Sequence, residues 1–543
     1  MKSLEIKGQI ENIIYSNETN GYTVCEMTSD MHLLTAVGYL PFINVGDVIV
    51  ASGDMVKHNV YGEQFKINTF EKVMPSNLNE IERYLGSGII KGVGPATAKK
   101  IVSKFGEESI YVLKCEPYKL AEIKGINHEK AEMISEEFNM LWELWQIVTF
   151  LQKYDIGTAN ANRVYKELGV SAIDIIKDNP YVLLDVLYGV GFEKVDRIAS
   201  ELGIEYNSPY RISSAIKHGL KLALRNGHTC VCVQSLVDFV VNTLGVDSET
   251  VTNELTSLCY AKQTYIEGEM VYLKEYFEAE ENIAKRLVSL SLDKVKKNIN
   301  LDKKIAEQEE KIGIKLSGDQ KKAIEMVFGS KVSIITGGPG TGKTTIIKML
   351  VKLFTYENKS ISLCAPTGRA AKRITETTGE EAKTLHRLLE IGKTADEGID
   401  LNMMVSKINS DVVIVDEMSM VDTAVMNYLV KGLKETTRLV LIGDADQLPS
   451  VGAGSILKDL IESSIIPTMN LTEIYRQAKE SNIIVNAHKI NDGENISLDE
   501  KEGDFIFIKE TNSMEQMVDI ILNKLPKMRK IWYIKRCTST NSY

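Results

Sequence analysis

The first 76 residues alternate between hydrophobic and polar positions. Five segments with this period of two lie between residues 4 and 74, and Asn/Gly and Asp/Gly turn signals separate them. Five strands in about 70 residues predict a small β-barrel of the oligonucleotide-binding type. A barrel that binds DNA and a barrel that contacts only other domains fit this pattern equally well.

Between residues 77 and 205 the hydrophobic period becomes helical, and glycine turns recur. The segment IKGVGPATAKKI, residues 90–101, has the signature of a helix–hairpin–helix, and weaker copies begin near residues 123, 154 and 188. Their spacing of about 30 residues indicates a repeat. Such hairpins offer backbone N–H groups to a DNA phosphate without reading bases. We expect Gly92, Gly94 and Lys99 to contact DNA. The alternative is that only a subset of the four hairpins contacts DNA and the others serve as packing units.

Residues 206–278 mix amphipathic helices with short strand-like segments, a pattern typical of a winged helix. The pattern does not indicate what this segment does. Residues 279–314 are rich in charge and helical in period, and we interpret them as a connector to the segment that follows.

A phosphate-binding loop follows the buried strand predicted at residues 332–336. The sequence GGPGTGKT fits the pattern G-x-x-x-x-G-K-[ST] and opens into an apolar helix. Its glycines let backbone N–H groups surround a β-phosphate, Lys343 bridges the β- and γ-phosphates, and the Thr344 hydroxyl ligates Mg²⁺. Gln320, before the preceding helix, can pair with adenine and so favours ATP. The predicted cofactor-binding residues are Gln320, Gly338, Pro339, Gly340, Thr341, Gly342, Lys343, Thr344 and Thr345.

Further apolar strands are predicted at residues 361–365, 412–415, 439–442 and 505–508. Parallel strands place their chemistry at their C-terminal ends, where polar clusters follow in this sequence. We expect Asp416 to hold Mg²⁺ through water and Glu417 to polarise the attacking water. Gln447 would sense the γ-phosphate.

The predicted fold is multidomain α/β, with a P-loop NTPase (RecA-like) motor lobe. A small β-barrel, helix–hairpin–helix repeats and a winged-helix-like segment precede this lobe. The predicted domains are residues 1–76, 77–205, 206–278, the connector 279–314, the ATPase lobe 315–510, and the start of a second RecA-like lobe at 511–543.

Composition adds few constraints. With 543 residues, 44% hydrophobic and 25% charged, the chain has the composition of a soluble globular protein of roughly three or four domains. Neither a membrane-spanning run nor a signal peptide is evident, so we expect a cytoplasmic protein. Seven scattered cysteines without a C-x-x-C pair indicate neither a zinc site nor a disulfide framework. The net charge of −10 argues against a whole-surface nucleic-acid binder, although a basic segment around Arg369 offers local phosphate contacts.

Six motifs together resemble superfamily 1 DNA helicases of the RecD/TraA type. They are GGPGTGKTT, APTGRAAKR, AKTLHRLL, VDEMSMVD, GDADQLPSVGAG and LTEIYRQA. The barrel and hairpin repeats resemble those of bacterial RecD-like helicases with an extended N-terminus. The resemblance implies ATP-driven 5′-to-3′ movement on single-stranded DNA and action at single-strand/duplex junctions. It further implies DNA contacts by Pro366, Thr367, Thr384 and His386, an arginine finger at Arg476, and a β-hairpin wedge within residues 390–406.

The resemblance also sets expectations for the C-terminal residues. A motor of this family has a second RecA-like lobe, whereas the sequence after Leu525-Pro526 lacks a core pattern, and a one-nucleotide shift permits a strand like the family's next one. We therefore expect a frameshifted gene, weak ATPase activity and no processive unwinding. Two alternatives are a DNA-binding module with a vestigial ATP-binding half-motor, and an ATPase switch that regulates a nuclease partner in recombination or repair.

Overall fold

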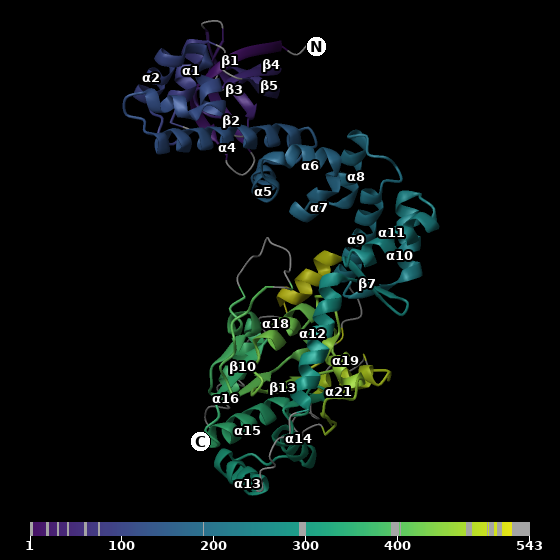
Figure 1. The fold of residues 1–543 in the computed structure, drawn as a ribbon. Coiled ribbons are helices and arrows are strands. Elements are labelled where there is room, and N and C mark those ends of the chain that lie inside the picture. Colours follow the sequence, from purple (N-terminus) through teal and green to yellow (C-terminus); the bar gives the residue numbers. More distant parts are fainter. Residues whose placement is uncertain are drawn as a thin grey trace. The chain divides into compact units, whose positions relative to one another are not determined.

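The computed structural model of this chain forms two compact units, which are considered separately. One unit comprises Met1–His218 and Val237–Leu255, and the other comprises Gly219–Leu236 and Thr256–Tyr543 (Figure 1). The structure describes residues 4–17, 21–29, 32–40, 43–58, 62–73, 77–88, 90–187, 189–292, 300–391, 401, 403–473, 481–496, 498, 504–505, 507 and 513–523.

The N-terminal strands close into a barrel with the order β1-β2-β3-β5-β4, which confirms the predicted fold of this segment. Its inward-facing positions, among them Ile10, Met27 and Phe65, are almost completely buried. The alternation in the sequence is therefore the alternation between the interior and the exterior of the barrel. The strands are β1 (Leu4–Ser16), β2 (Tyr22–Ser29), β3 (His32–Tyr39), β4 (Val48–His58) and β5 (Gly62–Val73).

Helices follow the barrel in the first unit. They are α1 (Leu78–Gly86), α2 (Pro95–Phe105), α3 (Ser109–Cys115), α4 (His128–Gln152), α5 (Thr158–Leu168), α6 (Ala172–Asp178), α7 (Leu183–Val186) and α8 (Phe192–Glu201). Short 3-10 turns connect some of them: η1 (Gly106–Glu108), η2 (Pro117–Glu122), η3 (Gly169–Ser171) and η4 (Pro180–Val182).

The four glycine turns of the sequence share one backbone design. In each, a residue with positive φ precedes the N-cap of the next helix by two positions. The positive-φ residues are Gly92 (85°), Gly125 (102°), Asp155 (53°) and Gly189 (76°), and the N-caps are Gly94, Asn127, Gly157 and Gly191. Glycine adopts such a φ freely, and Asp adopts it occasionally. The turns can therefore be recognised in the sequence, including the one in which Asp155 takes the place of the glycine.

The next segment has the helix and strand order of a winged helix. Its three strands form a sheet with the order β6-β8-β7. The division between the two compact units passes through this segment. Its elements are α9 (Pro209–Arg225), β6 (Cys230–Cys232), α10 (Val233–Leu244), α11 (Ser248–Tyr260), β7 (Thr264–Glu267) and β8 (Met270–Leu273).

The motor lobe is built on a six-stranded parallel sheet with the order β11-β10-β12-β13-β9-β14. The sequence predicted four of these strands, but β11 and β14 were not predicted because they are short and carry few apolar residues. Of the strand predicted at residues 505–508, Ile506 and Ile508 lie outside the described residues. The strands are β9 (Val332–Gly337), β10 (Ile361–Ala365), β11 (Ala382–Thr384), β12 (Val412–Val415), β13 (Arg438–Gly443) and β14 (Thr468–Leu471).

Helices bury both faces of this sheet. Leu439 and Leu441 of β13 belong to one hydrophobic cluster, whereas Val440 and Ile442 belong to the cluster on the opposite face. A strand buried on both faces reads as a continuous apolar run, as β12 and β13 do. The helices are α14 (Gly318–Gly329), α15 (Lys343–Tyr356), α16 (Gly368–Thr378), α17 (Leu385–Leu388), α18 (Thr423–Gly432), α19 (Ile456–Glu462) and α21 (Asn482–Asn491).

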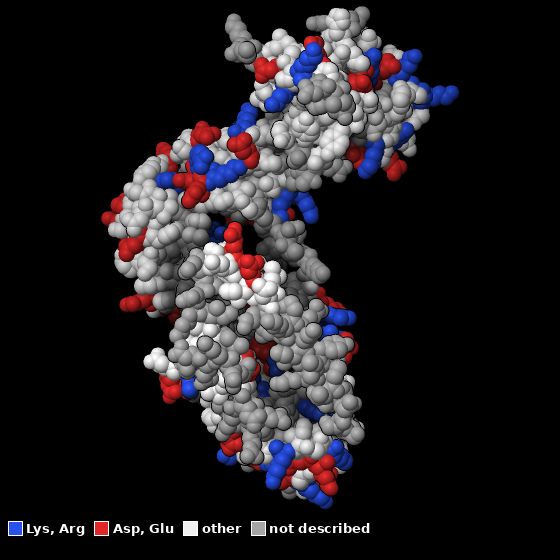
Figure 2. All heavy atoms as spheres, turned by 180° about the vertical axis from the view of Figure 1, so that it is seen from behind, with Lys and Arg blue, Asp and Glu red and all other residues white. Residues whose placement is uncertain are grey.

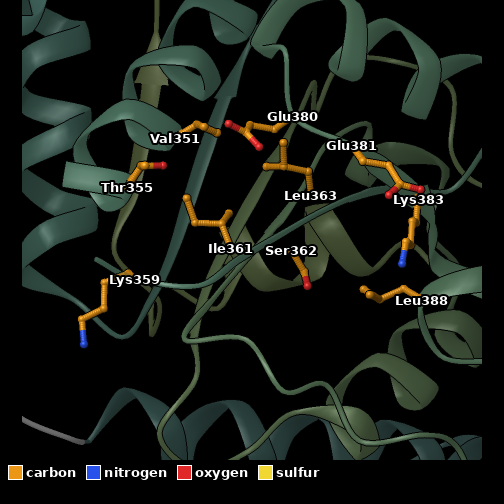
Figure 3. Close-up of a pocket in the computed structure, with 10 residues that line it drawn as sticks. All are labelled: Val351, Thr355, Lys359, Ile361, Ser362, Leu363, Glu380, Glu381, Lys383 and Leu388. Atoms are coloured by element: carbon orange, nitrogen blue, oxygen red, sulfur yellow. The ribbon is translucent and has the colours of Figure 1, made fainter. Parts of the chain in front are cut away.

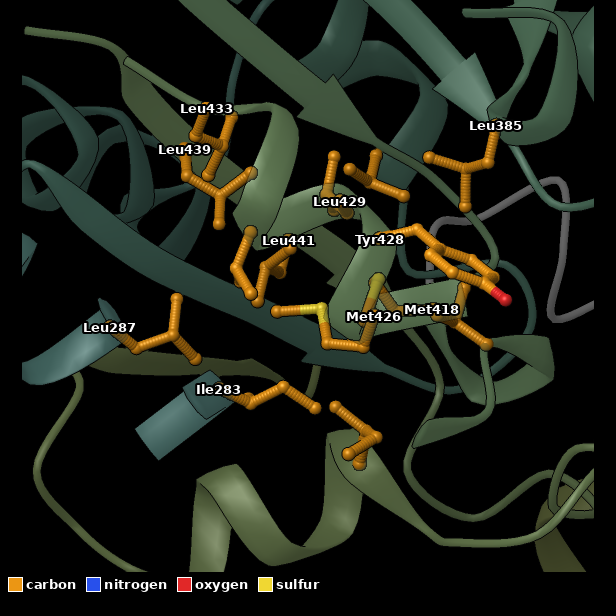
Figure 4. Packing of buried hydrophobic residues seen from close by; sticks show 14 of the residues in the cluster. Ile283, Leu287, Leu385, Met418, Met426, Tyr428, Leu429, Leu433, Leu439 and Leu441 are labelled. Atoms are coloured by element: carbon orange, nitrogen blue, oxygen red, sulfur yellow. The ribbon is translucent and has the colours of Figure 1, made fainter. Parts of the chain in front are cut away.

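The segment interpreted as a connector is instead part of the motor lobe. It forms α12 (Lys274–Ser291) and α13 (Leu301–Ile312). Ile283 and Leu287 of α12 lie in the same buried cluster as Leu441 (Figure 4). The sequence showed the charges of the exposed face of α12, but it could not show what its apolar face packs against. Within the described part of the chain, no helix has the length and apolar character needed to cross a membrane.

Candidate functional site

The phosphate loop joins β9 to α15 at the C-terminal edge of the sheet. Gly340 and Gly342 have φ values of 79° and 85°, which only glycine adopts without strain. The Lys343 ammonium group donates to the carbonyl oxygen of Gly337 and, at 3.0 Å, to that of Gly338. Its Nζ also lies 4.0 Å from a carboxylate oxygen of Asp444. The lysine is therefore held over the loop by contacts within the lobe.

Burial sets the charge balance of this site. It lowers the pKa of Lys343, although the neighbouring carboxylates of Asp444, Asp416 and Glu417 oppose this shift. Burial also raises the pKa of Asp416 from 3.8 to about 6. A buried carboxylate that pays such a desolvation cost fits the role of a ligand to a divalent cation.

The predicted Mg²⁺ site has few protein ligands. Among the described residues, no group of three or more His, Cys, Asp or Glu side chains is arranged to hold a metal ion. Thr344 is the second residue of α15, and Asp416 follows β12. A hydroxyl and a carboxylate are hard oxygen donors that suit Mg²⁺, which usually keeps waters and phosphate oxygens as its other ligands. The donor set therefore fits Mg²⁺ bound together with a triphosphate.

The residue after Asp416 has a strained backbone. Glu417 has φ 55°, a left-handed conformation that non-glycine residues adopt rarely, and it begins the turn η5 (Met418–Met420). The peptide N–H of Glu417 donates to the Asp416 carboxylate at 2.9 Å. Strained backbone of this kind is concentrated at functional sites, where the surrounding structure maintains it.

Gln447 links Asp444 to the turn that follows Glu417. Its amide nitrogen donates to the Asp444 carboxylate at 3.3 Å, and its amide oxygen accepts from the Ser419 hydroxyl at 3.4 Å. Asp444 lies beside Lys343, and Ser419 lies in the turn that follows Glu417. The residues predicted for phosphate binding, water activation and γ-phosphate sensing are thus brought together.

Gln320 is placed differently from the simplest expectation. It is 1% exposed, and its side-chain oxygen accepts from the Ser317 N–H at 3.1 Å as part of a capping box. Its amide nitrogen faces the carbonyl oxygens of Thr341 and Gly342 at 3.4 and 3.5 Å. Gln320 therefore braces the phosphate loop in this arrangement, and its contact with adenine stays a prediction.

The residues predicted to contact DNA in the motor lobe lie at the ends of two neighbouring strands. Ala365 of β10 pairs with Thr384 of β11, so Pro366 and Thr367 lie next to the segment that contains His386. The Thr367 and Thr384 hydroxyls cap α16 and α17 by accepting backbone N–H groups at 3.2 Å.

The basic residues of this region surround the same edge of the sheet. Arg369, Lys372 and Arg373 on α16 are exposed. On the face of the molecule seen in Figure 2, basic and acidic side chains are intermixed. The contacts of these α16 side chains with DNA stay a prediction.

The other predicted site residues belong to the first compact unit or lie outside the described residues. Gly92, Gly94 and Lys99 belong to the first compact unit. Gly94 is the N-cap of α2, and Lys99 is exposed on this helix. Arg476, the expected arginine finger, most of the expected wedge hairpin and the segment from residue 524 onward lie outside the described residues.

Comparisons with known protein families cover most of the chain. A model described as an AAA domain matches residues 315–510. The ATP-dependent RecD2 DNA helicase HHH domain matches residues 85–141 and 142–230. The OB-fold domain of the ATP-dependent DNA helicase YrrC matches residues 3–75. The three matches follow one another in the order of the barrel, the hairpins and the motor.

The chain belongs to the RecD-like helicases. It is 29% identical over 511 residues to the ATP-dependent RecD2 DNA helicase of Deinococcus radiodurans, a match that covers 90% of this chain and 70% of that protein. It is 38% identical over 168 residues to the RecBCD enzyme subunit RecD of Mycolicibacterium smegmatis, which covers 26% of this chain and 30% of that protein. The solved Pif1 helicase from Candida albicans aligns with a TM-score of 0.25 at 25% identity and covers 34% of this chain and 45% of its own, too weak a likeness to carry an argument.

Sequence reasoning missed one residue beside the phosphate loop of this RecD-like helicase. His488 on α21 has its Nε2 atom 3.1 Å from the carbonyl oxygen of Pro339. The two residues are far apart in the sequence, and a single histidine in an amphipathic helix gives no signal of such a contact. Only the packing of α21 brings it to the loop.

A cavity of about 400 Å³ lies on the same lobe, at the edge of β10 (Figure 3). Its polar lining includes Thr355, Lys359, Ser362, Glu380 and Lys383. None of the predicted nucleotide or DNA residues lines it, and β10 contributes Ile361 and Ser362 at the start of the strand rather than residues at its C-terminal end. The cavity is therefore not formed by the site residues predicted from the sequence.

Proposed function

We propose that this RecD-like helicase is a DNA translocase in which single-stranded DNA stimulates ATP hydrolysis and which moves in the 5′-to-3′ direction. The observation that carries the proposal is the continuous polar path from Lys343 through Asp444 and Gln447 to Ser419. This path joins the phosphate-binding lysine to the turn of the proposed water-activating residue, Glu417. Such an arrangement suits hydrolysis of a γ-phosphate.

Each residue has a defined task in this proposal. Lys343 exchanges its loop carbonyl contacts for the β- and γ-phosphates, and Thr344 and Asp416 would hold Mg²⁺, which would neutralise phosphate charge. Glu417 accepts a proton from the attacking water. Gln447 reports the presence of the γ-phosphate to Ser419, since its side chain bonds to both the Asp444 carboxylate and the Ser419 hydroxyl.

The DNA contacts are proposed at the neighbouring ends of β10 and β11. Phosphate contacts there would come from the exposed Arg369 and Lys372 and from the N-terminus of α16. The helix α16 begins where β10 ends, and β10 is the neighbour of β12 in the sheet. DNA bound at the start of α16 would therefore lie one strand from Asp416 and Glu417, which follow β12. This proximity supports stimulation of hydrolysis by DNA.

The test uses the purified 543-residue chain. ATP turnover with Mg²⁺ is measured with and without single-stranded DNA, and strand displacement is measured on duplexes with a 5′ or a 3′ single-stranded tail. The proposal requires that DNA raises turnover and that any displacement favours the 5′ tail. Turnover that is insensitive to DNA, or displacement of the 3′-tailed duplex alone, would overturn it.

A second candidate function comes from the relatives. Several are named as RecD subunits of the RecBCD enzyme, a multisubunit assembly by its name. We therefore also propose that this chain acts as an ATPase switch in an assembly with a partner nuclease. DNA-dependent turnover that changes on addition of a purified candidate nuclease would support this function, and turnover that does not change would argue against that partner.

A further inference from the structure

The His488 side chain contacts the tip of the phosphate loop. Its Nε2 atom lies 3.1 Å from the Pro339 carbonyl oxygen. A carbonyl oxygen can only accept a hydrogen bond, so Nε2 carries the hydrogen and donates it. The ring is half-buried on α21, and it reaches the loop from a part of the chain that follows the last described strand of the sheet.

The same ring explains a glycine that the phosphate-loop pattern does not require. Position 338 is one of the four free positions of G-x-x-x-x-G-K-[ST]. Gly338 does not have a positive φ, so its backbone would admit other residues. A Cβ atom at this position would lie 2.5 Å from Cε1, 3.2 Å from Nε2 and 3.4 Å from Nδ1 of His488. All three nearest atoms belong to this ring, which indicates that Gly338 is glycine because the imidazole packs against it.

The helix that carries His488 is anchored at its start. Ser481 caps α21 by accepting the Ile484 N–H at 3.4 Å, and the Asp504 carboxylate accepts the Asn482 N–H at 2.8 Å. Asn486, on the following turn, is 9% exposed. These contacts fix the start of the helix, two turns before His488.

We propose that His488 is a positioning residue of the ATP site, which holds the tip of the phosphate loop through Pro339. This inference rests on the proposed function, because it assigns His488 to the ATP site of that function. A loop that is fixed before the triphosphate arrives loses less conformational freedom on binding. The contact should therefore strengthen nucleotide binding more than it accelerates the chemical step, so its loss should raise KM more than it lowers kcat.

The first test compares three substitutions on α21 by titration with a fluorescent ATP analogue in Mg²⁺. His488→Ala removes one hydrogen bond and should weaken binding by about 2- to 10-fold. His488→Gln retains an N–H donor at a similar reach and should restore most of the affinity. Ile490→Ala is the matched control, since Ile490 is 61% exposed on the same helix and should bind as the unaltered chain does.

The second test uses the glycine. In Gly338→Ala the new Cβ displaces the ring, whose Cε1 atom is at the end of a rotatable side chain, so the contact is lost as in His488→Ala. The double variant Gly338→Ala/His488→Ala should bind no more weakly than either single variant. Such non-additivity is the signature of two residues that share one contact.

The results separate this inference from the function on which it rests. Lys343→Ala serves as the reference: retained binding together with retained turnover in that variant would refute the ATP site itself. The role of His488 alone is refuted if Lys343→Ala abolishes nucleotide binding while His488→Ala leaves it unchanged. It is also refuted if the losses of nucleotide affinity caused by Gly338→Ala and His488→Ala multiply in the double variant. A drop in kcat with unchanged KM in His488→Ala would also overturn it.

Discussion

Asp416 should destabilise the folded motor lobe at neutral pH when no divalent cation is bound. Burial raises its pKa from 3.8 to about 6. This difference of about 2 pKa units corresponds to about 3 kcal/mol at pH 7.5. The folded state binds the proton more tightly than the unfolded state, so this stabilising contribution is fully present below pH 3.8. It is lost as the pH rises through 6.

Replacing Asp416 with Asn removes the ionisation but keeps the shape of the side chain. In the presence of a chelator, the substitution should increase the unfolding free energy of the lobe at pH 7.5. Linkage with these two pKa values makes the gain about 1.4 kcal/mol larger at pH 7.5 than at pH 5. Changes in hydrogen bonding that do not depend on pH cancel in this difference. The same substitution should abolish the dependence of nucleotide binding on Mg²⁺.

Hydrogen exchange of peptides from β9 and β12, corrected for intrinsic rates, measures the local unfolding free energy at both pH values. Asp302→Asn is the control, because Asp302 is exposed on α13 of the same lobe. As a substitution at an exposed position, it should change the local unfolding free energy by less than about 0.5 kcal/mol. An equal gain for Asp416→Asn at pH 7.5 and pH 5, or a loss at pH 7.5, would refute the argument that burial controls the ionisation of this carboxylate.

Three further predictions concern ATP, DNA and packing. Lys343→Ala should abolish Mg·ATP binding or turnover, because the loop loses the ammonium group at the β- and γ-phosphates; equal affinity and turnover in a nucleotide titration and an ATPase assay would contradict this. Replacing Arg369 and Lys372 with Ala should weaken single-stranded DNA binding and reduce its salt dependence by about 0.7 in log–log slope per contact, and titrations with an unchanged slope would exclude these contacts. Leu287→Ala on α12 should destabilise the motor lobe by about 2–5 kcal/mol in the exchange experiment, because Leu287 is 2% exposed. Leu292→Ala should cost less than about 0.5 kcal/mol, because Leu292 is 78% exposed. Equal effects of the two substitutions would mean that α12 does not belong to the lobe core.

The phosphate loop and the hairpin turns were predictable because their conformations are encoded locally. Gly340 and Gly342 supply positive φ next to Lys343, and Gly92 does so two residues before the N-cap Gly94. The barrel strands were predictable for a related reason, since each has one buried face and therefore alternates. Three of the motor strands also read directly as buried runs that end in polar clusters. In these cases the chemical cause and the structural effect lie within a few residues of each other.

Long-range packing decided the features that no local pattern encodes. The sequence by itself determined the P-loop, the acidic pair after β12, the barrel and the repeat of turns. Only the tertiary structure decided that α12 is buried in the motor core, that β11 and β14 complete the sheet, and that His488 lies against Gly338. Each of these depends on partners far away in the sequence, and a short strand or a single histidine has no periodicity that would reveal its partner. The local pattern therefore encodes which conformation a segment adopts, whereas long-range packing decides which surface it contacts.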